Sequence, residues 1–169
     1  MKRYALSIVF CVLSASTAFA QTKSPVEGVW KIVEVVAPST SPAEKDATRT
    51  ISNPQPGLII FTRGYYSQIA VTGDQPRAAV EPAKDAQNMT DAEKIARFDQ
   101  WRPFTANAGT YEIKGTTLSM RAMVAKSVQV MTSQTPLEMT FKMEGANTLW
   151  LTPPAGSGLP TKLKLTRLE

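Results

Sequence analysis

The chain of 169 residues contains no histidine and a single cysteine, Cys11. The absence of histidine excludes Ser-His-Asp and Cys-His catalysis and every zinc site built on imidazole. We expect Cys11 to be removed with an N-terminal segment, which leaves the mature chain without disulfides, thiol nucleophiles or thiolate metal ligands. We therefore expect no metal site and no cofactor, and a fold that is stabilised by its hydrophobic core alone.

Residues 1–20, MKRYALSIVFCVLSASTAFA, have the three parts of a secretory signal peptide. Two basic residues precede a short apolar run at 4–12, and Ala-Phe-Ala at 18–20 has the form of a cleavage site. We expect cleavage before Gln21 and a mature protein located in the periplasm or secreted. Residues 21–169 then form one domain, long enough to bury a sizeable core.

A lipoprotein anchor at Cys11 is the alternative for this segment. Phe10 stands where a lipoprotein signal requires a small residue, and the cysteine lies early for the end of a signal. The apolar run is too short to span a bilayer comfortably, and no later segment approaches the ~20 apolar residues of a transmembrane helix. We expect an exported chain without a transmembrane segment.

The formal net charge of the whole chain is +5. Its basic residues are scattered and form no stripe with interleaved aromatic residues, which is the usual pattern of a nucleic-acid surface. We therefore expect no nucleic-acid partner. Mild attraction to anionic ligands or membrane surfaces remains open.

β-rich segments separated by turn residues run through nearly the whole mature chain. Tight turns join most of them, so an up-and-down antiparallel barrel is the economical way to leave no open edge. The predicted fold is all-β with eight strands. They are expected at 29–36, 57–61, 65–71, 109–113, 117–124, 137–143, 148–151 and 161–168.

Two longer connections interrupt this pattern. Residues 38–56 form a polar loop, and 73–108 contain one helix, with Thr90 and Glu93 as a capping box. Apolar residues follow at helical spacing, and Pro103 ends the helix. We expect this short helix between strands three and four, with its apolar face packed against an end or a flank of the barrel.

Alternation along the first and last strands predicts how the barrel closes. Arg167 shares a face with two leucines and lies opposite two lysines, so it points inward. If Trp30 also points inward, Glu34 on the same face points inward as well. Trp30 then meets Arg167 where the first and last strands pair. The guanidinium would then stack on the indole and seal one end, while Gly28 lets the chain turn tightly beneath it.

These features resemble the lipocalin pattern, in which a G-x-W tryptophan packs against an arginine of the final strand. Gly28, Trp30 and Arg167 occupy the matching positions. The segment PGLIIFTRGYYSQIAV at 56–71 is similar to the hairpin of bacterial and fungal lipocalin-like domains. The resemblance implies a calycin-type barrel. The chain departs from typical lipocalins because its helix does not follow the eighth strand and because it lacks disulfides.

Inward-facing apolar and polar side chains supply the candidate ligand contacts. Methionines would form an adaptable lining, although on their own they favour an ordinary core. A carboxylate inside the barrel would have a raised pKa and could accept a proton or bind a ligand, whereas at the open rim it would be solvated. Arg121 lies between Met120 and Ala122, on the opposite face of its strand from these apolar residues, and should face solvent. The candidates are Glu34, Tyr65, Tyr66, Tyr111, Met120, Met139 and Phe141.

Three functional hypotheses follow from this reading. The first is an exported barrel that carries or senses a small hydrophobic or amphipathic molecule without catalysis. The second is an isomerase or cyclase that uses a buried carboxylate such as Glu34 together with a tyrosine. The third is a filled barrel that acts through its surface, with the excursion at 73–108 as the partner site. An eight-stranded barrel can either be filled by its own side chains or hold one small ligand.

Overall fold

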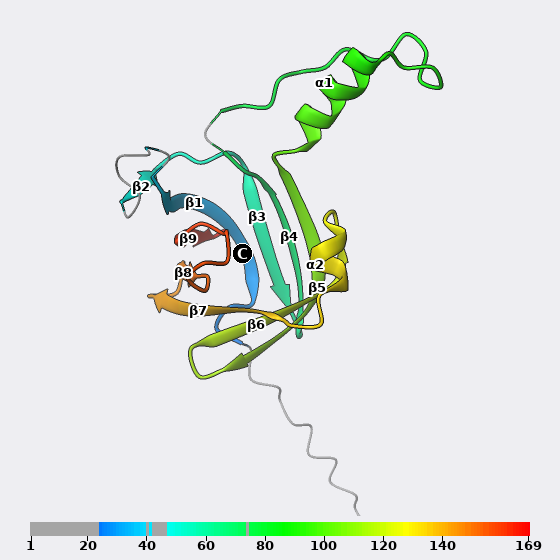
Figure 1. The fold of residues 1–169 in the computed structure, drawn as a ribbon. Coiled ribbons are helices and arrows are strands. Elements are labelled where there is room, and N and C mark those ends of the chain that lie inside the picture. Colours follow the sequence, from blue (N-terminus) through cyan, green and yellow to red (C-terminus); the bar gives the residue numbers. More distant parts are fainter. Residues whose placement is uncertain (1–23, 40, 42–46, 74) are drawn as a thin grey trace, which may run out of the picture.

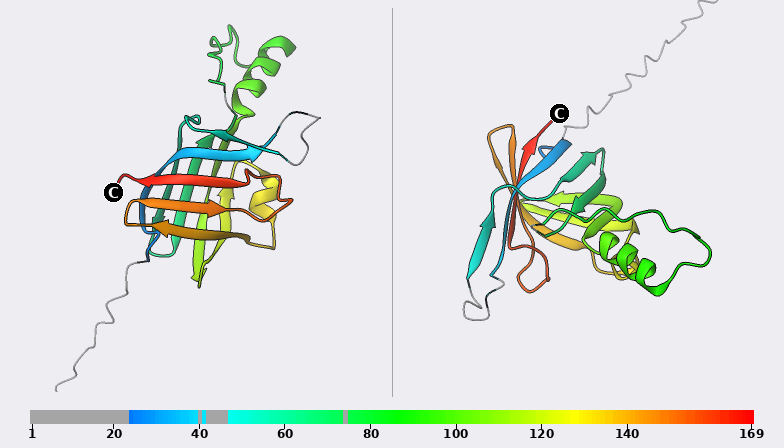
Figure 2. Two further views of the ribbon diagram at one scale, coloured as in Figure 1. Left: turned by 90° about the vertical axis from the view of Figure 1, so that its left-hand side faces the viewer. Right: turned by 90° about the horizontal axis from the view of Figure 1, so that it is seen from above.

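The computed structural model describes residues 24–39, 41, 47–73 and 75–169. The strands form one antiparallel sheet that closes on itself, because β1 (Gly28–Pro38) pairs with both β3 (Gly57–Thr62) and β9 (Lys162–Arg167). Figures 1 and 2 show the resulting barrel. The signal peptide expected at 1–20, with Cys11, lies outside the described residues.

The predicted all-β class and the closed eight-stranded antiparallel barrel are confirmed. Consecutive strands pair from β3 to β9, and each of the eight expected segments contributes one barrel strand. The remaining elements are β2 (Thr48–Ile51), β4 (Tyr65–Val71), α1 (Asp91–Trp101), β5 (Phe104–Lys114), β6 (Thr117–Ala125), α2 (Val128–Thr132), β7 (Leu137–Glu144) and β8 (Thr148–Thr152).

The predicted position of the helix between strands three and four is not matched, because α1 lies after β4. The difference arises from β2, a short strand inside the segment that was expected to be loop. This additional strand raises by one the number of strands that precede α1. β3 pairs with β1 only as far as Lys31. Further along β1, β2 pairs with its last residues, from Val35 to Pro38. The barrel wall is therefore extended on one side of its open end.

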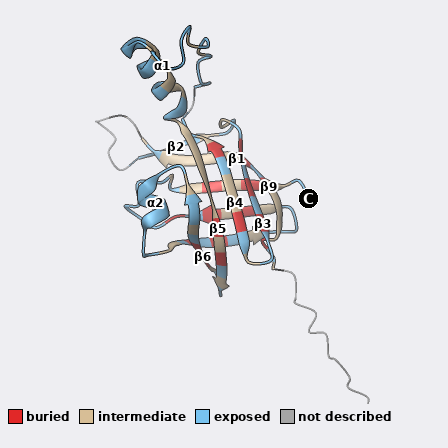
Figure 3. Ribbon diagram, turned by 90° about the vertical axis from the view of Figure 1, so that its right-hand side faces the viewer, coloured by how far each residue is buried: buried red, intermediate tan, exposed pale blue. Residues whose placement is uncertain are grey.

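The core fills the half of the barrel where β1 begins and β9 ends. Side chains alternate between the interior and solvent along β3, β8 and β9, as expected for strands with one buried face. The fully buried side chains on these strands are Ile59, Phe61, Leu149, Leu151 and Leu165. Figure 3 shows the buried positions concentrated on the barrel strands and the exposed surface of α1 above them.

The closed end has the predicted tryptophan–arginine pair. The Arg167 guanidinium carbon lies 4.2 Å from the centre of the fully buried Trp30 ring. The Arg167 side chain also donates hydrogen bonds to three backbone carbonyls, those of Pro25, Glu27 and Ala146. The Trp30 indole N–H donates to the Val26 carbonyl at 2.6 Å. One guanidinium and one indole thus bind the N-terminal segment to the end of the barrel.

Gly28 has a backbone conformation that only glycine adopts easily, with φ of 138°. A Cβ atom at this position would overlap the Glu169 carbonyl oxygen and the Arg167 guanidinium. Glycine therefore allows the C-terminal strand and its arginine to approach the start of β1. The sequence led us to expect a tight turn at Gly28, and the structure adds the close approach of Arg167 and Glu169 as a second reason for glycine at this position.

The predicted inward direction of Glu34 is wrong, because β1 contains a bulge. The register with β9 shifts between Ile32 and Glu34, so the alternation of the strand changes at this point. Val35 pairs with the buried Leu163 and packs against the core. Glu34 instead pairs with Lys164 and lies on the outer face of the barrel.

The capping box of α1 is present as predicted. The Thr90 hydroxyl accepts a hydrogen bond from the Glu93 backbone N–H at 3.3 Å, and the Glu93 carboxylate accepts one from the Thr90 N–H at 2.8 Å. The expected packing of the helix on the barrel is wrong, because none of its residues is buried and its apolar face is exposed. α1 leads into β5 through only two residues and projects beyond the barrel (Figure 1).

Thr90→Ala should destabilise α1 without affecting the barrel. Loss of an N-cap hydroxyl destabilises a helix by about 1 kcal/mol. Because α1 buries no residue in the barrel, we expect a change below ~0.5 kcal/mol in the unfolding free energy of the barrel. Amide hydrogen exchange measures both quantities. An equal loss of protection in α1 and in the barrel strands would contradict their independence.

Candidate functional site

A cavity of about 590 Å³ opens at the end of the barrel opposite Trp30 and Arg167. Its wall is built from the C-terminal half of β1, from β2, β4 and β5, from parts of β6 and β7, and from the loops at the open end. Its volume lies within the ~300–1,000 Å³ typical of small-molecule sites. The barrel is therefore filled at one end and hollow at the other.

Apolar side chains form most of the cavity wall. The buried side chains of Tyr66, Met120 and Met139 lie on it, at the boundary with the filled core. Flexible thioethers adapt to ligands of irregular shape. Other apolar contributors are Ile32, Val35, Ala70, Ala122, Leu137 and Leu163.

Gln68 and Asn107 bring two amides to the cavity. They are register partners on β4 and β5, so they share one face of the sheet, and both line the cavity. Amide groups both donate and accept hydrogen bonds, so this pair can fix the orientation of a polar ligand group. Neither amide was among the site residues predicted from the sequence. The pattern that could have identified them is the two-residue alternation of β4, which places Gln68 on the same face as Tyr66 and Ala70.

The rim contains residues from elements that were not predicted. Arg49 and Ile51 of β2 pair with Ala37 and Val35 of β1 and line the same side of the opening. The short helix α2 contributes two further lining residues on another side. These contacts were not predicted because β2 is only four residues long and lies within a polar segment that the sequence pattern marks as a loop.

The described lining residues of the cavity include Arg49 and Arg121 but no aspartate, glutamate or lysine. Arg121 is exposed, as expected, and its guanidinium donates a hydrogen bond to the Gln134 carbonyl at 3.0 Å. The side chains at the opening thus give the site a positive electrostatic bias.

The predicted site residues occupy three different environments. Tyr66, Met120 and Met139 line the cavity. Tyr111 and Phe141 are buried but lie outside its lining, and Tyr111 packs edge-on against Phe61 with ring centres 5.1 Å apart. The third environment is the outer surface, which carries Tyr65 and Glu34.

Burial raises the pKa of the Tyr66 phenol above its ordinary value of about 10. The pKa of Tyr111 is raised as well, chiefly by burial. Tyr66 is therefore protonated at neutral pH. Its hydroxyl can donate or accept a hydrogen bond at the cavity wall.

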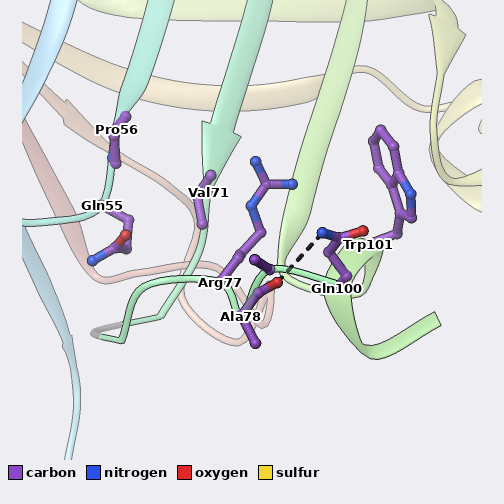
Figure 4. A pocket seen from close by; sticks show the side chains of 8 residues that line it. Gln55, Pro56, Val71, Arg77, Ala78, Gln100 and Trp101 are labelled. Carbon is purple, nitrogen blue, oxygen red and sulfur yellow. Dashed lines mark hydrogen bonds between the residues drawn. The ribbon is translucent and has the colours of Figure 1, made fainter. Parts of the chain in front are cut away.

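A second hollow lies outside the barrel, between the end of β4, residues 77–79 and α1 (Figure 4). This groove has a volume of about 490 Å³. It shares Gln55 and Val71 with the cavity, so the two spaces adjoin at the open end. The lining residues of the groove are Gln55, Pro56, Val71, Arg77, Ala78, Ala79, Gln100 and Trp101.

In the described part of the chain, no cluster of three or more histidine, cysteine, aspartate or glutamate side chains is arranged to hold a metal ion. Neither of the helices in these ranges has the length and apolar character that crossing a membrane requires.

No protein-family model matches the chain, and no curated protein matches it in sequence. Among solved structures, the chain is similar to a lipocalin-like protein from Bacteroides uniformis ATCC 8492. The sequence identity is 14% and the TM-score is 0.46, with 86% of this chain and 100% of that chain covered. The closed antiparallel barrel with Trp30 and Arg167 in contact at one end is the arrangement that the sequence resemblance to lipocalin-like domains implied.

Proposed function

We propose that the protein is an exported binding protein that carries or senses a small hydrophobic or amphipathic molecule without catalysis. The observation that supports this most is the open, mainly apolar cavity of about 590 Å³ in a barrel whose other end is sealed. A concave apolar space with a few convergent polar groups is the usual form of a small-molecule site. Export is part of the proposal because of the signal-like segment at 1–20.

The isomerase or cyclase hypothesis loses the group on which it depended. It required a buried carboxylate near a tyrosine, and Glu34 lies on the outer face of β1. No described residue that lines the cavity carries a carboxylate. Tyr66 cannot replace that carboxylate, because its raised pKa keeps the phenol protonated at neutral pH and leaves no phenolate to accept a proton. The geometry therefore favours binding over catalysis.

The filled-barrel hypothesis is disfavoured by the cavity itself. Its volume is ample for a small ligand, and its lining reaches from the buried Met120 and Met139 to residues of the loops at the open end. The exposed apolar face of α1 remains compatible with a surface role. Such a role would add to ligand binding and would not replace it.

Native mass spectrometry of the protein, purified gently from the periplasm of its own host, tests this function directly. We expect a reproducible extra mass of a few hundred daltons that can be extracted into organic solvent. If the protein shows only its apo mass and also fails to bind the neutral apolar probe N-phenyl-1-naphthylamine, the binding function is wrong.

Ala122→Phe should weaken ligand binding by filling the cavity. Ala122 lines the wall, and a phenyl ring there would occupy space that a ligand needs. We expect at least about tenfold weaker binding of N-phenyl-1-naphthylamine, since loss of one well-packed apolar contact of this size is worth about 1.5–3 kcal/mol. The measurement is a fluorescence titration.

Ala106→Phe is the matched control. Ala106 pairs with the exposed Ile69, so its side chain lies on the outer face of the same sheet. This variant should bind the probe like the unmodified protein. Equal probe affinity in the Ala122→Phe and Ala106→Phe variants would show that the probe does not enter the barrel.

A further inference from the structure

We propose that the ligand is an anionic amphiphile, whose apolar body occupies the barrel cavity while its negatively charged group is held in the adjoining groove by Arg77. This inference rests on the proposed binding function and specifies the ligand class of that same site. Four features of the open end support it.

The first feature is the continuity of the two spaces. Gln55 and Val71 line both the barrel cavity and the groove. A molecule seated among the apolar side chains of the barrel can therefore extend past these two residues into the groove. The change from an apolar wall to a groove with arginine and glutamine side chains matches the two ends of an amphiphile.

The second feature is the sign of the charges. Among the described residues that line either space, the charged side chains are Arg49, Arg77 and Arg121, and none is acidic. Charges of one sign around a concave opening concentrate ligands of the opposite sign. A carboxylate, sulfonate or phosphate group is favoured over an ammonium group by this arrangement.

The third feature is the fixed position of Arg77. Its guanidinium carbon lies 5.4 Å from the centre of the Phe104 ring, within the range of a cation–π contact. Trp101 packs edge-on against the same ring, with ring centres 5.4 Å apart. The neighbouring Ala78 carbonyl accepts a hydrogen bond from the Gln100 side chain at 3.3 Å, which ties the segment to α1 (Figure 4).

The fourth feature is that Arg77 retains its capacity for an anion. In the part of the chain that the structure describes, the ion pairs involve other residues. The cation–π contact with Phe104 uses none of the guanidinium N–H groups as hydrogen-bond donors to an oxygen. The edge of the guanidinium presents parallel N–H groups that match the oxygens of a carboxylate or phosphate.

The test compares ligands that differ only in charge. Decanoate and decanol are titrated against the complex of the intact mature protein with N-phenyl-1-naphthylamine, and displacement of the probe gives each affinity. In Arg77→Gln, we expect decanoate to bind about threefold to tenfold more weakly, as for loss of one partly solvated charged contact. Decanol and the probe should bind as before. Decyl phosphate should show the same dependence on Arg77, and its affinity relative to decanoate identifies the better-fitting head group.

Arg63→Gln is the control for the change in net charge. Arg63 is an exposed arginine in the turn between β3 and β4, away from the lining of either space. It should leave the affinity for decanoate unchanged. If the probe and decanol bind but decanoate affinity does not depend on Arg77, the inference fails while the binding function stands. If neither the probe nor decanol binds, the proposed function fails and this inference fails with it.

Discussion

Trp30→Ala should lower the free energy of unfolding by about 3–5 kcal/mol, the usual range for removing a fully buried large aromatic ring. The ring has no solvent exposure, and its indole N–H donates to the Val26 carbonyl at 2.6 Å. It also covers the Arg167 guanidinium at 4.2 Å. The substitution removes the packing, a hydrogen bond and the cover of a cation together. Urea denaturation of the purified protein measures the loss.

Trp101→Ala is the matched control, because Trp101 is 52% exposed on α1. It loses mainly the edge-on contact with Phe104, so it should change the unfolding free energy by only about 1 kcal/mol or less. Should Trp30→Ala fail to fold, Trp30→Phe preserves a ring and should give an intermediate loss. Probe affinity of the folded fraction should stay the same, because Trp30 lies outside the cavity lining. Strong loss of affinity at unchanged stability would instead place Trp30 in the ligand site.

The closed end could be predicted from the sequence because its determinants are local. Gly28 and Trp30 are two residues apart, and the facing of Arg167 follows from a regular alternation of leucine and lysine in β9. The β1–β9 register then pairs Trp30 with Arg167 directly. The three carbonyls that Arg167 binds could not be predicted, because they come from segments far away in the sequence.

The facing of Glu34 could not be predicted, because side chains alternate between the two faces of a strand only while the strand is regular. The bulge between Ile32 and Glu34 inserts one residue and reverses the alternation beyond it. Nothing in the local sequence, which is rich in valine on both faces, marks this position. The lumen assignment for the second half of β1 changed with it, and the isomerase hypothesis lost its carboxylate.

β4 shows a second limit of pattern reasoning. Ile69 and Tyr65 are more apolar than Gln68, yet they are exposed, while Gln68 lines the cavity. A ligand cavity reverses the usual rule because it needs some polar groups inside. An exposed face that carries isoleucine and tyrosine then makes both sides of the strand look alike. The two amides could therefore not be recognised from the sequence, because polar residues on the inner face of a strand resemble an ordinary solvent-facing pattern.

A bulge also interrupts β6, and here the sequence contains its determinant. The register between β5 and β6 shifts at Gly109, where Ala108 pairs with Val124 and Gly109 with Ala122. Val124 is consequently exposed and does not continue the inner face of Leu118 and Met120. Close approach of one strand to the bulged partner is a typical reason for a glycine inside a strand.

Gly109→Ala should therefore destabilise the barrel by about 3 kcal/mol, at the upper end of the range for overpacking. A Cβ atom at Gly109 would overlap the Arg121 carbonyl oxygen and lie 2.8 Å from the Met123 backbone nitrogen. Both are backbone atoms, so the strand itself would have to move. Because β6 carries Met120 and Ala122 on the cavity wall, we expect weaker probe binding as well. Chemical denaturation and fluorescence titration give the two values.

Gly57→Ala separates this effect from the general consequence of adding a methyl group to a barrel glycine. The nearest atom to a Cβ at Gly57 is the Ile32 Cδ1 at 2.7 Å, the end of a side chain that can rotate. The lower backbone entropy of alanine in the unfolded chain offsets part of that strain by about 0.4–1 kcal/mol. We therefore expect a loss of less than ~1 kcal/mol. Similar losses in the two variants would mean that β6 can shift freely, and that Gly109 does not determine the bulge that shapes this side of the cavity.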